Sequence, residues 1–167
     1  LPPAQSEPFD SFMHDLDEII MPGITHWQSP NFFAYFPANS SPPSVLAEMI
    51  TAALGAQCMI WETSPAAAEL EEKMMEWLKM MTGLPAGFEG VIQDSASSAT
   101  LAALITAREK ATQFRSNSDG LKDEGRLRIY ASTQAHSSVE KGAGVAGFGR
   151  KNQVRVSVRS DYSIDPV

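Results

Sequence analysis

The chain has 167 residues, of which 43% are hydrophobic and 20% charged, as in an ordinary globular domain with a core of its own. The formal net charge is −7 without a basic cluster, which argues against a nucleic-acid partner, and no apolar run approaches the roughly 20 residues of a membrane span. A single cysteine, Cys58, and the lack of a basic and apolar leader predict a cytoplasmic protein, in which we expect no metal site.

The first third of the chain is predicted to be helical with an aromatic interruption. Apolar residues recur at helical spacing over residues 9–20, and Pro22-Gly23 ends this helix. Residues 24–41 combine turn-forming residues with a cluster of aromatic side chains. The apolar stripe of residues 45–54 then predicts a second helix.

A longer helix follows the second one. Ser64-Pro65 supplies an N-cap and a first-turn proline, and the apolar face continues to Met81. Because Glu69 and Lys73 are four residues apart, we expect them to form an ion pair on this helix.

Beyond residue 90 the pattern alternates between strands and helices. Strands are predicted at 91–92, 127–130 and 154–158, and helices at 99–114 and 137–145. This β-α-β-α-β order is typical of a parallel sheet covered by helices, so the predicted fold class is α/β. We interpret the charged segment 116–126 as a surface loop.

One glycine pattern, Gly142-x-Gly144-x-x-Gly147, has the spacing of the dinucleotide-binding fingerprint. That fingerprint requires a strand before it and a helix after it, so that the helix start meets the pyrophosphate. Here the glycines end a predicted helix and lead into a strand. We therefore interpret them as a helix-ending connection and predict no nicotinamide site.

The segment from Gln93 to Thr100 is a better candidate for a ligand site. It joins a predicted strand to a predicted helix through small residues, which leave the N–H groups of the helix start accessible to an anion. Serine is also a good helix N-cap, and composition alone favours that structural role. Ser95, Ala96 and Ser97 therefore form either a cap or an anion site.

His136 lies between a predicted strand and a predicted helix, at the edge of the sheet where ligands bind in open α/β folds. Most isolated histidines are structural, and that alternative stays open here. The shared sheet edge of His136 and Ser95–Ser97 strengthens the functional interpretation of both.

Four stretches are more specific: Thr25–Pro37, Ser64–Glu71, Gln93–Thr100 and Gln134–Lys141. Together and in this order they resemble the N-terminal portion of the group II pyridoxal-phosphate-dependent decarboxylases of the aromatic-L-amino-acid type. The resemblance covers nearly the whole chain. It implies a fold-type I PLP-dependent transferase-like α/β fold, with an N-terminal helical dimerisation segment at 1–64 and the first part of the mainly parallel-sheet, PLP-binding large domain at 65–167.

The resemblance also assigns roles to matching residues. Ser95, Ala96 and Ser97 would bind the phosphate of pyridoxal 5′-phosphate, and His136 would stack on its ring beside the reacting carboxylate. The substrate pocket would be lined by Tyr35, Phe36, Ala38, Gln57 and Met59. The last two would reach into the site of a partner subunit, because the family forms homodimers with shared active sites.

Several residues depart from the common family pattern. Asp94 stands where glycine is common, and Ser98 stands where an acidic residue is common. Ala38, Gln57 and Met59 change the wall of the implied pocket. Which aromatic amino acid is preferred therefore stays open.

The implied activity is decarboxylation of an aromatic L-amino acid to its amine and carbon dioxide. In the family, the cofactor-binding lysine, the aspartate facing the pyridine nitrogen and a catalytic tyrosine loop come from later sequence, and no lysine here lies in a matching motif. Both ends of the chain are typical of a segment of a longer polypeptide, so residues 1–167 alone are expected to be inactive and to need the remainder. Two alternatives stay open, an aldehyde synthase that couples decarboxylation to oxidative deamination and a non-catalytic dimerisation scaffold.

Overall fold

The computed structural model describes residues 5–38, 40–122 and 125–165, and the chain divides into two compact units, Leu1–Ala56 and Gln57–Val167. The domain organisation predicted at 1–64 and 65–167 stays a prediction. Among the described residues, no helix is long and apolar enough to cross a membrane.

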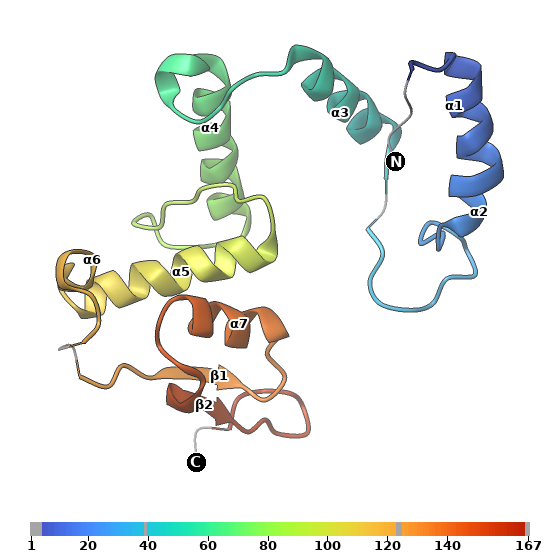
Figure 1. Cartoon of the computed structure of the whole chain (residues 1–167). Coiled ribbons are helices and arrows are strands. Elements are labelled where there is room, and N and C mark those ends of the chain that lie inside the picture. The colour runs from blue at the N-terminus through green and yellow to red at the C-terminus, as the bar shows by residue number, and fades with distance from the viewer. Residues whose placement is uncertain (1–4, 39, 123–124, 166–167) are drawn as a thin grey trace. The chain divides into compact units, whose positions relative to one another are not determined.

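The first unit holds two helical stretches joined by an aromatic loop (Figure 1). Its first stretch runs without a break through α1 (Phe9–Asp15), a π-helical turn (Leu16–Ile20) and α2 (Met21–Gly23). The helix predicted over 9–20 is thus confirmed, and it continues to Gly23, the predicted stop.

The second stretch is α3 (Pro42–Leu54), which the apolar stripe predicts. Ser41 and Ser44 cap its start, each side chain accepting the other residue's backbone N–H. Gly55 follows its end with φ of 56°, the left-handed region in which glycine avoids the cost of a Cβ. Sequence-encoded caps therefore set both ends of this helix.

The second unit begins with helices and alternates strand and helix from β1 onward, so the predicted β-α-β-α-β order holds only for its last three elements. In chain order it contains α4 (Pro65–Met81), α5 (Ala96–Ala111), α6 (Arg115–Asp119), β1 (Ile129–Ser132), α7 (Ser137–Val145) and β2 (Gln153–Val156). Strands β1 and β2 are parallel, with Ile129 opposite Gln153 and Ser132 opposite Val156. Helix α7 connects them, so β1-α7-β2 forms a crossover unit of the α/β class.

One predicted strand is wrong. Residues 91–92 form no strand, because the backbone N–H of Ile92 donates to Oε1 of Glu71 on α4 at 2.7 Å instead of joining a ladder. Among the described residues the sheet has two strands. A strand needs a neighbour to satisfy its backbone, and a two-residue apolar run does not provide one.

Other local predictions also need correction. Helix α5 begins at Ala96 and not at residue 99, because the serines that precede its apolar positions already form its first turn. The predicted loop 116–126 begins inside α6, whose Ser116 is buried. Lys73 pairs with Glu76 and not with Glu69, whose carboxylate accepts a hydrogen bond from the Trp61 indole at 3.0 Å.

The core of the second unit lies where α5 packs against α7 and α6. Ala143 and Ala146 are 0% and 1% exposed, and Thr112 is 1% exposed. Small side chains allow α5 and α7 to approach closely: a Cβ on Gly142 of α7 would lie 3.0 Å from Cδ1 of Leu104 of α5. By contrast, the apolar face of α4 is open within the described residues, with Trp77 47% exposed.

Candidate active site

Helices α5 and α7 start at the same end of the second unit. Gly142, in the middle of α7, lies beside Leu101 and Leu104 in the middle of α5, and the C-cap carbonyl of α7 at Ala146 accepts a hydrogen bond from Arg108 in the last turn of α5. The helices are therefore parallel, as the ribbon also shows (Figure 1). Their N-terminal ends lie side by side.

The start of α5 is an N-cap whose hydrogen bonds leave two donors free. Oγ of Ser95 accepts from the backbone N–H of Ser98 at 3.3 Å, and Oγ of Ser98 accepts from the backbone N–H of Ser95 at 3.1 Å. The N–H of Ala99 donates to the Ser95 carbonyl. The backbone N–H groups of Ala96 and Ser97 have no acceptor among the described residues.

These two N–H groups suit an anion. The first N–H groups of a helix point outward, and the helix dipole places positive potential there. The Ser97 side chain is exposed and its hydroxyl has no hydrogen-bond partner in the described part of the chain. The cap and the anion site, which the sequence left as alternatives, are therefore compatible: Ser95 forms the cap, and its neighbours keep their donors.

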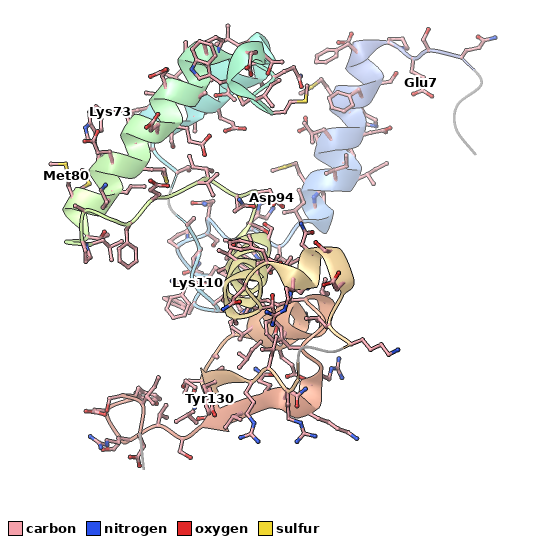
Figure 2. The ribbon with its side chains drawn as sticks, turned by 90° about the vertical axis from the view of Figure 1, so that its left-hand side faces the viewer. Glu7, Lys73, Met80, Asp94, Lys110 and Tyr130 are labelled. Atoms are coloured by element: carbon pink, nitrogen blue, oxygen red, sulfur yellow. The ribbon has the colours of Figure 1, made fainter. Side chains whose placement is uncertain are left out.

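Asp94 belongs to the same turn and lies just ahead of α5 (Figure 2). Its Oδ1 accepts a hydrogen bond from the Ser98 hydroxyl. This hydrogen bond, supported by donors of Ser95, holds the pKa of the Asp94 carboxyl below its usual range. A capping box usually carries its acidic residue at N3, the position of Ser98; here the hydroxyl is at N3, and the carboxylate precedes the cap.

His136 is the N-cap of α7. Its Nδ1 accepts from the backbone N–H of Ser138 at 3.2 Å, and the Ser138 hydroxyl lies 3.0 Å from the same nitrogen. Because Nδ1 acts as an acceptor, the proton of the neutral ring is on Nε2. The ring is exposed, and Nε2 has no hydrogen-bond partner among the described residues, so its far edge is available.

The candidate substrate residues of the first unit lie in the aromatic loop. Trp27 stacks on Phe32 with ring centroids 5.1 Å apart and on Tyr35 with centroids 5.2 Å apart. Tyr35 has φ of 57°, a left-handed backbone that costs free energy outside glycine, and the stacking helps to offset this cost. Phe36 is 99% exposed, and the Ala38 carbonyl accepts from Nε2 of Gln28 at 2.7 Å.

Gln57 and Met59 belong to the second unit, directly before the 3₁₀ turn Trp61–Thr63. The Gln57 carbonyl accepts from the Thr63 hydroxyl at 2.6 Å, and Met59 is 75% exposed. The five candidate substrate residues are therefore split between the two units. Ser95–Ser97 and His136 lie at the starts of two packed helices in one unit, but not at one sheet edge as predicted, because residues 91–92 form no strand. The structure does not test the assembly of the substrate pocket.

Two features escaped the sequence interpretation. The bond between Asp94 and Ser98 is one, since a capping box is normally recognised by an acidic residue at N3. The other is the α5–α7 contact through Arg108, since its acceptor is a backbone carbonyl and leaves no sequence signal. The prediction that the glycine pattern lies at the end of a helix is confirmed, because Gly142 and Gly144 lie inside α7 and Gly147 follows it.

No group of three or more metal-ligating side chains is present among the described residues. The donors at the α5 start, two backbone N–H groups and a hydroxyl, fit a phosphate group. An imidazole at the neighbouring helix start adds a flat ring with a free N–H. This combination is compatible with a phosphorylated, aromatic cofactor.

The solved structures that this chain resembles have the same class of fold. An Oryza sativa structure, described as TDC with PLP and tryptamine, superposes with a TM-score of 0.89 at 38% identity over 99% of this chain and 36% of that one. The 4-hydroxyphenylacetaldehyde synthase of Rhodiola rosea superposes with a TM-score of 0.88 at 36% identity, over 99% of this chain and 36% of that one. The chain therefore has the fold of the N-terminal portion of fold-type I PLP-dependent enzymes.

The family follows from the sequence comparison. Residues 2–163 match the pyridoxal-dependent decarboxylase conserved domain, and the chain belongs to this family. The aromatic-L-amino-acid decarboxylase of Bos taurus is 46% identical over 89% of this chain and 33% of that protein. The chain thus spans about a third of the length of these relatives, and the cofactor of the family is pyridoxal phosphate.

Proposed function

We propose that this chain supplies the phosphate site and part of the active site of a PLP-dependent decarboxylase, which converts an aromatic L-amino acid to its amine and carbon dioxide. The observation that carries the proposal is the pair of free N–H groups at Ala96 and Ser97, beside the α7 start with His136. The 46% identity with an aromatic-L-amino-acid decarboxylase supports the reaction class.

Pyridoxal 5′-phosphate would bind with its phosphate at the α5 start. Ala96 would donate its backbone N–H, and Ser97 would donate its N–H and its hydroxyl, while Ser95 holds the turn. When bound, the cofactor supplies an electron sink for cleavage of the bond to the carboxylate carbon. At the start of α5 the protein would hold the phosphate and thereby fix the position of the cofactor ring.

His136 would lie against the cofactor ring. Its cap bond to Ser138 orients the imidazole and fixes the proton on Nε2 of the neutral ring. A flat ring held in this way can stack on a pyridine and donate a hydrogen bond near the substrate carboxylate. We assign His136 the catalytic role on this basis.

The substrate would be a small aromatic amino acid bound between aromatic side chains. Tyr35 and Phe36 are 77% and 99% exposed within this chain, as many of its large apolar side chains are, so both rings are accessible to a ligand. With Ala38 they would line one wall, and Gln57 and Met59 would come from the partner subunit of a homodimer. The remainder of the polypeptide would supply the cofactor-binding lysine, and we expect the enzyme in the cytoplasm.

A second candidate reaction has a specific observation in its favour. The TM-score with the 4-hydroxyphenylacetaldehyde synthase is 0.88, and the TM-score with the tryptamine-bound structure is 0.89, so the fold resembles both equally well. Such an enzyme would consume dioxygen and water and release carbon dioxide, an aldehyde, ammonia and hydrogen peroxide. The phosphate site and His136 would serve both reactions, so these residues do not separate them.

A product assay separates the candidates. The complete polypeptide with pyridoxal phosphate is given tryptophan, tyrosine, dihydroxyphenylalanine and phenylalanine in turn, and carbon dioxide, amine, aldehyde and peroxide are quantified. Amine equal to carbon dioxide without peroxide is the expected result. Aldehyde and peroxide would establish the second candidate, and no carbon dioxide from any substrate would leave only the scaffold role.

A further inference from the structure

The parallel packing of α5 and α7 couples two parts of the proposed site. Helix α5 begins with the residues assigned to the phosphate, and α7 begins with His136. If α7 slid along α5, His136 would move by the same distance relative to Ala96 and Ser97. The register between the two helices therefore sets the position of the imidazole over a cofactor held by its phosphate.

Arg108 fixes this register at the far end of the helices. Its Nη1 donates to the Ala146 carbonyl at 2.7 Å, and its Nη2 and Nε donate to Oε1 of Glu109 at 2.7 and 3.2 Å. The side chain is 19% exposed, and Ala146 is 1% exposed. Arg108 comes twelve residues after Ala96, about 18 Å along a helix, so it acts only through the packing.

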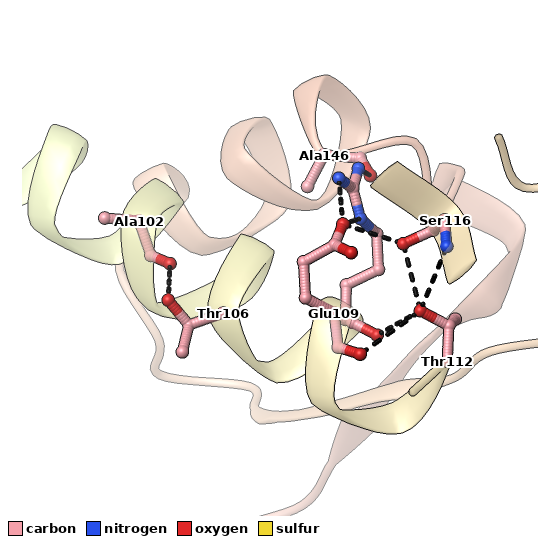
Figure 3. Close-up of polar contacts among 7 residues, drawn as sticks. Ala102, Thr106, Glu109, Thr112, Ser116 and Ala146 are labelled. Atoms are coloured by element: carbon pink, nitrogen blue, oxygen red, sulfur yellow. Dashed lines mark hydrogen bonds and ion pairs between the residues drawn. The ribbon is translucent and has the colours of Figure 1, made fainter. Parts of the chain in front are cut away.

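Glu109 holds the arginine in place. Its Oε1 also accepts from the hydroxyl of Ser116 on α6 at 2.7 Å (Figure 3), and this bond and the Arg108 guanidinium lower the pKa of the carboxyl. The carboxylate is therefore ionised near neutral pH and keeps the guanidinium oriented toward α7. Arg108 is thus held on one side and bonded to the C-cap carbonyl of α7 on the other.

Gly142 provides a second, steric point of register. A Cβ there would lie 3.0 Å from Cδ1 of Leu104 and 3.8 Å from Cα of Leu101. A Cβ at this position would crowd the end of the Leu104 side chain, which would have to shift by a few tenths of an ångström, and would be in ordinary contact with Leu101. Helices α5 and α7 therefore pack closely at the middle, and the Arg108 hydrogen bond joins them at the end. Two separate contacts therefore resist the same sliding motion.

We propose that Arg108 is a positioning residue of this enzyme, which fixes the register of α7 on α5 through the Ala146 carbonyl and so places His136 relative to the cofactor phosphate. This inference rests on the proposed function. The phosphate donors belong to α5 itself, so loss of the register moves the imidazole and leaves the phosphate contacts intact. A misplacement of about 1 Å from a distant substitution can lower a rate about 100-fold.

The test uses Arg108→Met in the complete holoenzyme, since methionine keeps the apolar stem and removes all three donated bonds. We expect kcat to fall about tenfold, with KM and the dissociation constant of pyridoxal phosphate within about twofold of the parent. The visible circular dichroism of the bound cofactor should change, because the imidazole moves against its ring. Arg108→Lys keeps a cation that can donate to the same carbonyl, and it should recover most of kcat.

Two further variants make the test specific. Arg155→Met removes an exposed ion pair between β2 and α7, Arg155 with Glu140 at 2.6 Å, without touching α5, and should leave kcat and the dichroism unchanged. Gly142→Leu, whose side chain is too large for a small shift of Leu104 to accommodate, should reproduce the kcat loss and the spectral change by the steric route, even if Arg108→Met does not fold. If Arg108→Met lowers the melting temperature but keeps the parent kcat and dichroism, the positioning role is wrong. A parent enzyme that releases no carbon dioxide would instead refute the proposed function.

Discussion

Arg108 donates a hydrogen bond to the backbone carbonyl of Ala146 at 2.7 Å, which joins the last turn of α5 to the C-cap of α7. Two buried residues adjoin this contact: the Thr112 hydroxyl donates to the Arg108 carbonyl, and the Ser116 hydroxyl donates to Glu109. The contact shows how a chain with few large buried side chains orders its helices. Small residues allow close approach, and a charge-assisted hydrogen bond sets the register.

Ser116→Ala tests the role of Glu109 in this arrangement. Without the Ser116 hydroxyl, the pKa of Glu109 should rise toward its ordinary value of 4.5, and the melting temperature should fall by a few degrees. Side-chain NMR titration and thermal unfolding measure the two effects. Ser118→Ala on the same short helix is the matched control and should change neither quantity. A Glu109 pKa that is the same in both variants would contradict the assignment.

Asp94 should make the stability of the α5 start depend on pH. Its pKa is lowered from 3.8 by the Ser98 hydroxyl, so its contribution is full above about pH 5 and is lost as the pH falls through the lowered pKa. Asp94→Asn should therefore reduce the free energy of unfolding at pH 7 and have a much smaller effect at pH 3. Urea unfolding at both pH values is the measurement, with Glu89→Gln in the preceding loop as the control. An equal effect at both pH values would show that the carboxylate charge is not involved.

His136 combines a structural and a proposed catalytic role, and one substitution separates them. Asparagine is among the best N-caps and can accept from the Ser138 N–H, so His136→Asn should keep the melting temperature within about 2 °C. The ring is lost, so we expect release of carbon dioxide to fall at least about 100-fold. His136→Ala should lose both cap and activity. An active asparagine variant would mean that His136 is only a cap.

Much of the second unit could be predicted because its signals are local. The proline in the first turn of α4 and the glycine after its end bound a helix whose range, 65–81, matches the prediction. The strand at 91–92 failed for a non-local reason, since the Ile92 N–H is taken by a side chain 21 residues earlier. Helix α6 was missed because polar residues form it and only its packing makes it helical.

The candidate site likewise combines features that have a local sequence signal with features that depend on non-local contacts. Ser95–Ser97 and His136 could be found because a helix start and a strand end each leave a sequence signal. That they lie together follows from the α5–α7 packing through Gly142 and Arg108, which no local pattern contains. The substrate-binding residues were assigned from the family resemblance alone, and the pocket that they would form together remains a prediction.

Residues 1–167 alone should show no turnover. The proposed mechanism needs a lysine bonded to the cofactor, and no lysine in this chain lies in the matching motif. The purified segment, with pyridoxal phosphate and an aromatic amino acid carrying a labelled carboxylate, should release no labelled carbon dioxide above the rate of cofactor alone. Adding the remainder of the polypeptide should restore release. Turnover by residues 1–167 alone would refute the claim that the remainder of the polypeptide is needed for activity.

The phosphate site is the central claim, and the affinity of Ser97→Ala for two ligands tests it most directly. The complete protein is titrated with pyridoxal phosphate and with pyridoxal, which lacks the phosphate, before and after the substitution. Loss of one hydroxyl donor should weaken pyridoxal phosphate binding about tenfold and leave pyridoxal binding unchanged. Thr100→Ala, one turn later, where the hydroxyl donates to the Ala96 carbonyl at 2.8 Å, should affect neither ligand. Equal loss for both ligands, or no loss for either, would contradict a phosphate site at the start of α5.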